Sequence, residues 1–408
     1  MTGSGGALGG IRILDLSRVL AGPACTQLLG DLGAEVIKVE RPGIGDETRT
    51  WGPPFVKDGS DADSSESAYY LCCNRNKRSI AIDMSRPEGL ELIKRLLGRS
   101  DVLIENFKVG GLAKYGLAYD DLKDEFPGLI YCSITGYGQT GPYAPRPGYD
   151  MIAQAMGGLL SMTGEPDRPP SKVPVAINDV MTGMYAAVAI LAALRHRDAT
   201  GDGQHIDLAL LDVQVAWLYN QGLNYLTGGD IPKRMGTGHP NSVPYQVFES
   251  ADGFILLAAN NDGQFSRFCA LVGREDLLQD PRFASNAARV RNRDAVVAEV
   301  QRIVRQKPSA YWIEELAAID VTCGPINTID EVFADPQIAA REMKISMPHA
   351  VSGSGAVDLI GNPMKLSGTP VSYRLPPPTL GEHTDAVLQE VLGLDEGLIA
   401  SLRSSGVI

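Results

Sequence analysis

The stretch from Ile11 to Glu40 reads IRILDLSRVLAGPACTQLLGDLGAEVIKVE. It begins with a short apolar strand at 11–16 and ends with a second strand at 34–40. Between them lies an apolar helical run that starts at Pro23, a residue suited to a first helical turn, and stops around Gly33. A helix that joins two apolar strands this closely predicts parallel pairing, and therefore an α/β sheet.

The alternation of strands and helices continues along the chain. We predict further strands at 78–83, 101–105, 128–134 and 204–208. We predict helices that begin near residue 85, run through 151–162, and run from about 180 to 197. All of these segments extend the α/β pattern that the first 40 residues begin.

The pattern changes after about residue 216, where a strand at 253–259 is followed mainly by helical segments. We therefore predict a smaller α+β domain at 216–329. The proline-rich tail ends in a helix, and we expect it to return to the first domain. The large α/β domain is then formed by residues 1–215 together with 330–408.

The composition excludes several classes of protein. The chain has 408 residues, a net charge of −12 and 44% hydrophobic residues, as a soluble globular protein has. A phosphate backbone is repelled by this charge, so we expect no nucleic-acid partner. No run approaches 18 uninterrupted apolar residues, and the first residues lack the features of a secretory signal, so we expect no membrane span.

The cysteines and histidines are scattered. The six cysteines lack the spacing of a disulfide framework or a zinc site, and the five histidines lack metal-ligand spacing. We therefore expect reduced thiols, a cytoplasmic location and no metal ion. A catalytic cysteine is the alternative interpretation, but each thiol lies in an apolar segment that favours an inert, buried side chain.

The first strand-to-helix turn bears on the idea of a dinucleotide site. A turn that binds NAD carries GxGxxG, but residues 17–23 contain Gly22 alone, which argues against a tightly held NAD. Glu40 ends the second strand, where a carboxylate binds ribose in such proteins. Arg41 follows at once and suits a phosphate better.

Other loops have two interpretations each. Residues 74–78, Asn-Arg-Asn-Lys-Arg, form either a solvated loop or, with Lys38 and Arg41, a phosphate-binding loop. The glycine-rich segment 136–150 follows a predicted strand, and such loops often line active sites in open α/β sheets. Segment 236–245 is either a plain turn or a mobile lid.

Asp179 directly precedes a long apolar helical run. Aspartate at such a position commonly caps the helix by accepting a hydrogen bond from a free N–H group. The alternative is a carboxylate nucleophile at the positive end of the helix, where the dipole keeps the carboxylate ionised. The segment by itself leaves both interpretations open.

Seven segments resemble, in the same order along the chain, the class III CoA-transferases, the family that includes carnitine-CoA and formyl-CoA transferases. The segments are Arg18–Pro23, Gly33–Arg41, Asn76–Ser79, Glu105–Phe107, Gly136–Gly138, Asn178–Asp179 and Gly381–Thr384. The resemblance covers nearly the whole chain. It implies a Rossmann-like large domain built from both chain ends, a small domain, and a homodimer of interlocked ring-like chains.

The resemblance also implies roles for individual residues. Asp179 matches the nucleophilic aspartate of the family. Positions that line the CoA site match Val19, Ala21, Arg41, Lys77, Asn106 and Phe107, and Lys114 stands where a basic residue meets the CoA phosphates. Coenzyme A is then a substrate, and no cofactor is bound permanently. Leu20 replaces the glutamine of formyl-CoA transferase, and the later run of four glycines of that enzyme is absent, which argues against formate or oxalate as substrate.

Within the family, the resemblance is greatest to the transferases that move CoA from succinyl-CoA to glutarate-like dicarboxylic acids. It rests on residues 45–55, 130–142 and 243–246. We therefore predict CoA transfer to a short-chain carboxylic acid, with a dicarboxylic acid favoured, through an aspartyl-CoA thioester. Candidate contacts to the acid are Tyr149, Arg49, Arg234 and His239.

Two alternatives belong to other classes. The α-methylacyl-CoA racemases share the fold and use a histidine–aspartate pair, but Tyr149 takes the place of the histidine. A tyrosine with a pKa near ~10 is a poor proton shuttle at neutral pH, which disfavours a racemase-like enolising enzyme. A non-catalytic CoA-binding protein is disfavoured by the intact Asn178–Asp179 pair.

Overall fold

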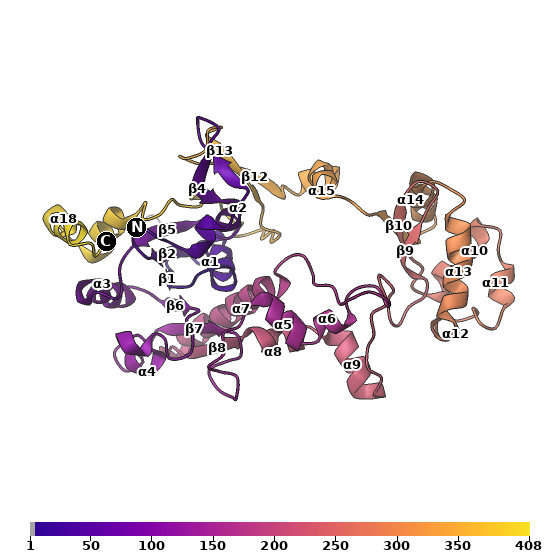
Figure 1. Cartoon of the computed structure of the whole chain (residues 1–408), viewed down its shortest axis with the longest axis horizontal. Coiled ribbons are helices and arrows are strands. Elements are labelled where there is room, and N and C mark those ends of the chain that lie inside the picture. Colours follow the sequence, from indigo (N-terminus) through magenta and orange to yellow (C-terminus); the bar gives the residue numbers. More distant parts are fainter. Residues whose placement is uncertain (1–4) are drawn as a thin grey trace. The chain divides into compact units, whose positions relative to one another are not determined.

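The computed structural model describes residues 5–408, which form two compact units (Figure 1). The first unit comprises the described residues up to 157 together with 174–217 and 336–408. The second comprises 158–173 and 218–335. The sequence pattern placed the division near residues 216 and 330 and did not distinguish the short segment 158–173.

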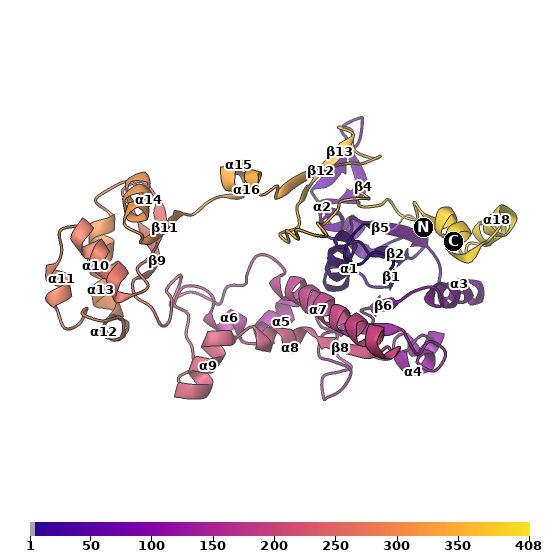
Figure 2. The same ribbon diagram turned by 180° about the vertical axis from the view of Figure 1, so that it is seen from behind.

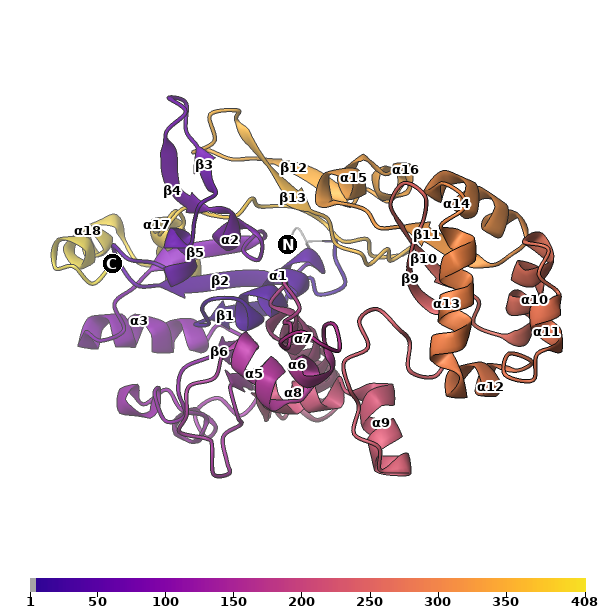
Figure 3. The same cartoon turned by 45° about the vertical axis from the view of Figure 1, so that its right-hand side comes forward.

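A six-stranded parallel sheet organises the first unit, in the order β5-β2-β1-β6-β7-β8 (Figure 1). Figure 3 shows β5, β2, β1 and β6 of this sheet from another side. The strands are β1 (Arg12–Asp15), β2 (Glu35–Glu40), β5 (Lys77–Ala81), β6 (Val102–Glu105), β7 (Ile130–Thr135) and β8 (His205–Ala209). If these strands are numbered one to six along the chain, their order is 3-2-1-4-5-6, which is that of the doubly wound Rossmann fold. The predicted parallel α/β sheet is therefore confirmed.

Successive side chains of each strand point to opposite faces of the sheet, so helices cover both. On one face Ile13 packs with α1 (Ala21–Asp31), α5 (Asp150–Met156) and α7 (Ile177–Thr200). On the other, Leu14 packs with α3 (Pro87–Leu97), α17 (Thr384–Leu392) and α18 (Glu396–Ser404). The C-terminal tail thus belongs to the core of the first unit.

Two glycine positions shape the helices around the site. A Cβ atom at Gly183 of α7 would lie 2.7 Å from the carbonyl oxygen of Ala21, so only glycine lets α7 cross this close to the start of α1. The helix predicted at 151–162 is interrupted at Gly158, whose φ is 89°. It therefore divides into α5 and α6 (Leu159–Met162).

The remaining elements of the first unit are short. They are η1 (Glu47–Thr50), β3 (Phe55–Lys57), β4 (Asp63–Ser67), α2 (Ala68–Leu71), η2 (Ala113–Tyr115), α4 (Tyr119–Leu122), α8 (Leu210–Ala216), α16 (Pro336–Ala340), β12 (Lys344–Pro348) and β13 (Ala356–Ile360). β3 pairs with β4, and β12 with β13, in two antiparallel ribbons.

The second unit has its own core around Phe248, Phe268 and Trp312. A three-stranded antiparallel sheet in the order β11-β10-β9 carries helices that follow the pattern predicted for an α+β domain. Its elements are α9 (Tyr219–Gly228), β9 (Tyr245–Glu249), β10 (Phe254–Ala258), α10 (Asp262–Leu271), α11 (Asp276–Gln279), α12 (Asn286–Arg291), α13 (Arg293–Val304), α14 (Ser309–Ala318), β11 (Thr322–Pro325) and α15 (Ile329–Ala334), with α6 in the same unit.

Helix α7 is more apolar than a helix with one buried face requires. Its length and a mean hydropathy of 1.6 would suit a membrane span, although one face of the helix packs on α1 and the sheet as a core helix does. The other face leaves Met184 and Val188 50% and 65% exposed. Figure 2 shows α7 running beside α5 and α8, which also expose apolar side chains.

Candidate active site

A cavity of about 170 Å³ opens at the carboxyl ends of the central strands. In an open α/β sheet, ligands bind where the strand order reverses, which here is between β1 and β6. The loops after these two strands line the cavity, and so do the loop after β7 and the start of α7. Six of the predicted site residues meet there: Val19, Ala21, Asn106, Phe107, Tyr149 and Asp179.

Asp179 lies in the first turn of α7 but does not cap it. The capping carboxylate is that of Asp150, at the start of α5, which accepts the backbone N–H of Asn178 at 2.7 Å and of Asp179 at 3.3 Å. Within the described chain, no group donates a hydrogen bond to the Asp179 carboxylate. The helix-cap interpretation of Asp179 is therefore wrong, and its carboxylate is left to react.

The environment of Asp179 favours the protonated acid. Burial, together with the negative charge of Asp150, raises the pKa of Asp179 to about 7. The expectation that the helix dipole keeps this carboxylate fully ionised is therefore not met, because desolvation and a like charge outweigh the dipole. A carboxylate with this pKa is a better nucleophile than an ordinary aspartate and is still ionised in part at neutral pH.

Tyr69, from the short helix α2, is within electrostatic range of Asp179. Burial and the charge of Asp179 raise the pKa of the Tyr69 phenol to about 12, so its hydroxyl remains a hydrogen-bond donor. Trp51 packs edge-to-face on its ring, with centroids 5.1 Å apart. The sequence analysis missed Tyr69, because neither spacing nor charge distinguishes it from the buried Tyr70 beside it.

Asn106 fixes the loop after β1. Its side-chain oxygen accepts the Arg18 N–H at 2.9 Å and its amide nitrogen donates to the Arg18 carbonyl at 2.7 Å. The Arg18 guanidinium in turn lies over the Phe107 ring, 5.3 Å from its centroid. Two wall segments that are 88 positions apart in sequence are thus held to each other.

A second cavity, of about 500 Å³, shares Arg18, Glu47 and Phe107 with the first. Arg41 and the aromatic ring of Tyr115 line it, and the Lys114 ammonium lies 4.6 Å from the centroid of that ring. Its volume is in the range of pockets that hold cofactor-sized ligands. An extended ligand with an aromatic end and anionic groups can therefore reach from this cavity to Asp179.

Two predicted binding residues are placed elsewhere. Lys77 is fully buried, where its ammonium donates to the Pro23 carbonyl at 2.8 Å and to Asn74 at 2.9 Å, and it lines neither cavity. Its charge is paired in the interior of the first unit. The contact of its side chain with CoA stays a prediction.

Arg49 also lies outside both cavities. The residue is 4% exposed, and its guanidinium forms ion pairs with Glu40 at 2.7 Å and with Glu66 at 2.7 Å. It also donates to the Tyr70 hydroxyl and the Pro378 carbonyl. Its donors are thus engaged within the protein, and a contact of Arg49 with the substrate carboxylate stays a prediction.

The remaining two predicted residues belong to the second unit. Arg234 donates to the backbone carbonyls of Glu165 and Pro166. His239 stacks on Tyr245 with centroids 5.0 Å apart, and burial lowers its pKa. Their contact with the acid stays a prediction.

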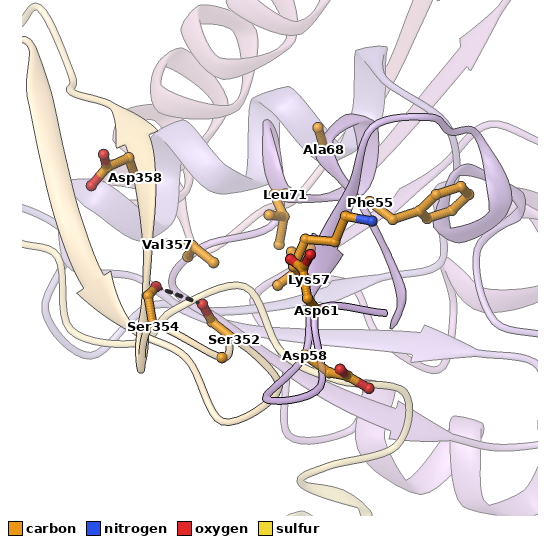
Figure 4. Close-up of a pocket in the computed structure, with 12 residues that line it drawn as sticks. Phe55, Lys57, Asp58, Asp61, Ala68, Leu71, Ser352, Ser354, Val357 and Asp358 are labelled. Carbon is orange, nitrogen blue, oxygen red and sulfur yellow. Dashed lines mark hydrogen bonds between the residues drawn. The ribbon is translucent and has the colours of Figure 1, made fainter. Parts of the chain in front are cut away.

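A third cavity, of about 460 Å³, lies between the β3–β4 ribbon and β13 (Figure 4). Lys57 and Asp58 come from one side, and Ser352, Ser354 and Val357 from the other. None of the predicted site residues lines it. Throughout residues 5–408, His, Cys, Asp and Glu side chains form no group of three that could hold a metal ion.

Comparisons with known proteins identify the family. Residues 8–384 match CoA-transferase family III. A succinate–glutarate CoA-transferase of Agrobacterium fabrum is 50% identical over 94% of this chain and 95% of its own. A succinyl-CoA:glutarate CoA-transferase of Mus musculus is 44% identical over 98% of this chain and 90% of its own. The crystal structure of a CAIB/BAIF family protein from Brucella suis, 49% identical, covers 95% of this chain and 99% of its own with a TM-score of 0.83. The chain therefore belongs to CoA-transferase family III and is a transferase that acts on CoA thioesters.

Proposed function

We propose that the protein transfers CoA from succinyl-CoA to a short dicarboxylic acid through a covalent intermediate on Asp179. The observation that carries this proposal is the Asp179 carboxylate, which lines the cavity while Asp150 caps its helix. The relatives described above are named for succinate and glutarate, which are both dicarboxylates. Support thus comes from the reactive group and from the family separately.

The exchange proceeds by four acyl transfers. The Asp179 carboxylate attacks the donor thioester, the C–S bond breaks, and a mixed anhydride and CoA thiolate form. The thiolate attacks the Asp179 carbonyl and releases the donor acid, which leaves an aspartyl-CoA thioester. The acceptor carboxylate displaces the thiolate to give a second anhydride, and the thiolate then attacks the acceptor carbonyl. Acceptor-CoA leaves, Asp179 is regenerated, and no net proton or electron is transferred.

Two kinds of donor can stabilise the negative oxygens of these steps. The first N–H groups of a helix have no acceptor within it, and Leu20 and Ala21, at the start of α1, line the cavity. The Tyr69 hydroxyl, whose pKa burial and the charge of Asp179 raise, stays protonated. Preorganised donors of this kind act on charge that develops only during the reaction.

Arg146 is the cation that we assign to the second carboxylate of the acid. It lines the cavity together with Tyr149 and Asp179, and its guanidinium lies 4.0 Å from the centroid of the Tyr143 ring. Arginine binds carboxylates through two parallel hydrogen bonds. Arg41 and Lys114, at the other cavity, are then available to the phosphates of CoA.

The protein forms a homodimer in this proposal, with the interlocked ring-like chains that the family resemblance implies. The exposed apolar face of α7, at Met184 and Val188, supports an interface between copies. The neighbouring helices α5 and α8 also expose large apolar side chains, at Met151, Ile152 and Val215. Large exposed apolar areas mark protein–protein interaction sites. Sedimentation equilibrium measures the mass in solution, and a monomer contradicts the proposal.

We further propose that the protein works in the cytoplasm. All six cysteines are free thiols, which fits a reducing compartment. Cell fractionation with an antibody against the chain tests this location, and recovery from a membrane or an extracellular fraction contradicts it.

Mass spectrometry tests the intermediate directly. The enzyme is incubated with succinyl-CoA, quenched in acid and digested, and the peptide that contains Asp179 is weighed. We expect a mass increase that corresponds to CoA bound at Asp179, and none in D179A, which should still bind CoA. A panel of mono- and dicarboxylic acids then identifies the acceptor. An unmodified peptide together with continuing turnover contradicts the proposed mechanism.

The same preparation separates the rival functions. A racemase-like enzyme would exchange the α-proton of an acyl-CoA in deuterated water without a second acid. A non-catalytic protein would bind CoA without forming a new thioester. We expect neither behaviour, because Tyr149, 64% exposed, stands where the racemases carry their histidine.

A further inference from the structure

Val19, in the wall of the active-site cavity, has an unusual backbone conformation. Its φ is 69°, in the left-handed region that a β-branched residue rarely adopts. Of the six non-glycine residues with positive φ in the described chain, it alone is β-branched. Such conformations persist only where the surrounding structure enforces them, and they concentrate at functional sites.

A buried carboxylate holds this peptide. The Val19 N–H lies 3.3 Å from each carboxylate oxygen of Asp46. Asp46 caps η1 through Thr48 and is fully buried. The left-handed conformation of Val19 therefore points its N–H inward, to an acceptor that comes from a different loop.

The partner of Asp46 is Lys38, from β2, which is also fully buried. Its ammonium donates to Asp46 at 2.9 Å and to the Ser17 carbonyl at 3.0 Å. Lys38 and Asp46 thus hold the loop at positions 17 and 19, while Asn106 holds position 18 from the other side. Burial raises the pKa of Asp46, but Lys38 and Thr48 lower it to about 2 in total, so the pair is ionised.

We infer that the Lys38–Asp46 pair is a positioning device for the reaction. It holds Val19 in the left-handed conformation and so sets where the first N–H groups of α1, at Leu20 and Ala21, stand in the cavity of Asp179. The inference rests on the proposed function, because it concerns the same site. Neither side chain of the pair touches the reacting atoms, and their effect passes through the backbone of the loop.

The test replaces both charges with apolar side chains of similar size, in the variant K38M/D46L. In this variant, Asp15 retains its ion pair with Lys77, at 3.4 Å, and Glu40 retains its ion pair with Arg49. The loss of Lys38 therefore leaves neither of these two carboxylates without a cation. Replacement of a buried ion pair by apolar residues is often neutral for stability. Lys38 and Asp46 also line the second cavity, so the Kd for CoA is measured beside kcat. We expect a folded enzyme whose kcat is about 10- to 100-fold lower, a larger loss than the loss of CoA affinity.

A second substitution distinguishes positioning from general destabilisation. Glycine adopts a φ of 69° without steric penalty, so V19G removes the need to hold the loop. We expect V19G to restore kcat about 5-fold or more in the K38M/D46L background, and to give no gain in the wild-type background. If the effects of V19G and K38M/D46L on kcat simply multiply, the inference is overturned. A kcat of K38M/D46L within about 2-fold of wild type overturns it as well.

The variants D46N and D120N complete the design. D46N keeps an acceptor for the Val19 N–H but loses the ion pair, so we expect an intermediate loss of kcat. Asp120 is exposed and paired with Lys123 at 2.7 Å, so D120N controls for the loss of an ion pair elsewhere. If K38M/D46L and D46N both fail to fold, the pair is purely structural and the inference is overturned. Failure of the proposed function is seen separately, as wild-type enzyme that carries no CoA on Asp179.

Discussion

Asp150 accepts the backbone N–H of Asp179 at 3.3 Å, so the carboxylate that caps helix α7 is also the nearest negative charge to the nucleophile. One side chain therefore has two effects. It satisfies a free donor at the helix start, which releases Asp179 from capping. It also raises the pKa of Asp179, after the larger effect of burial.

The pH dependence of the reaction follows from this relationship. Only the ionised carboxylate attacks, and the pKa of Asp179 is about 7, so kcat/KM for the acyl donor should fall as the pH drops below about 7. D150N removes the neighbouring charge, lowers the pKa of Asp179 and should move this acid limb to lower pH. Rate profiles of both enzymes from pH 5 to 9 check this. Superimposable acid limbs would show that another group controls the rate.

The stability of D179N gives an independent measure of the same pKa. A folded-state pKa of about 7 against an ordinary value of 3.8 means that the folded protein binds this proton more tightly than the unfolded chain does. Between these pH values, stability falls as the pH rises, and above about 7 the ionised carboxylate is destabilising. D179N should therefore exceed wild type by roughly 1–3 kcal/mol in free energy of unfolding at pH 8, and match it near pH 4. Urea unfolding at the two pH values measures this, and equal stabilities at pH 8 would contradict the raised pKa.

Tyr69 should contribute to turnover more than to binding. The charge of Asp179 helps to raise the pKa of its hydroxyl, which therefore stays protonated and can donate to oxygens that become negative during acyl transfer. We expect Y69F to lower kcat about 10-fold or more while the KM for succinyl-CoA changes little. Y311F, in α14 of the second unit, is the matched control because Tyr311 lines none of the three cavities. An unchanged kcat in Y69F removes Tyr69 from the mechanism.

Arg146 should determine the preference for a second carboxylate. R146Q removes the charge and the paired donors, so the KM for glutarate should rise about 10-fold, with a smaller change for a monocarboxylate of similar length. Arg282, exposed and paired with Asp280 at 2.7 Å, offers R282Q as the control. The Kd for CoA, measured by calorimetry, tests the alternative that Arg146 binds the phosphates of CoA. A loss of CoA affinity with no change in acid preference would assign Arg146 to the phosphates.

The candidate site was predictable where the relevant residues lie next to regular elements. Val19 and Ala21 follow β1, Asn106 and Phe107 follow β6, and the carboxyl ends of parallel strands meet at one edge of a sheet. The burial of Arg49 and Lys77 was not predictable, because their sequence neighbours give no sign of the carboxylates that pair with them in the interior. A charged side chain in a loop is expected at the surface, because charged groups are rarely buried without a partner and the sequence does not show the partner.

The sequence by itself determined the parallel sheet, the helices on both of its faces, and the position of Asp179 at the start of a helix, because these depend on local periodicity and on chain order. Only the tertiary structure decided what Asp179 can do. Asp150 is 29 positions away in the sequence, yet it accepts the backbone N–H of Asp179 and raises the pKa of its carboxylate. The reactivity of a carboxylate depends on burial and on neighbouring charges, and these arise only when distant segments pack together.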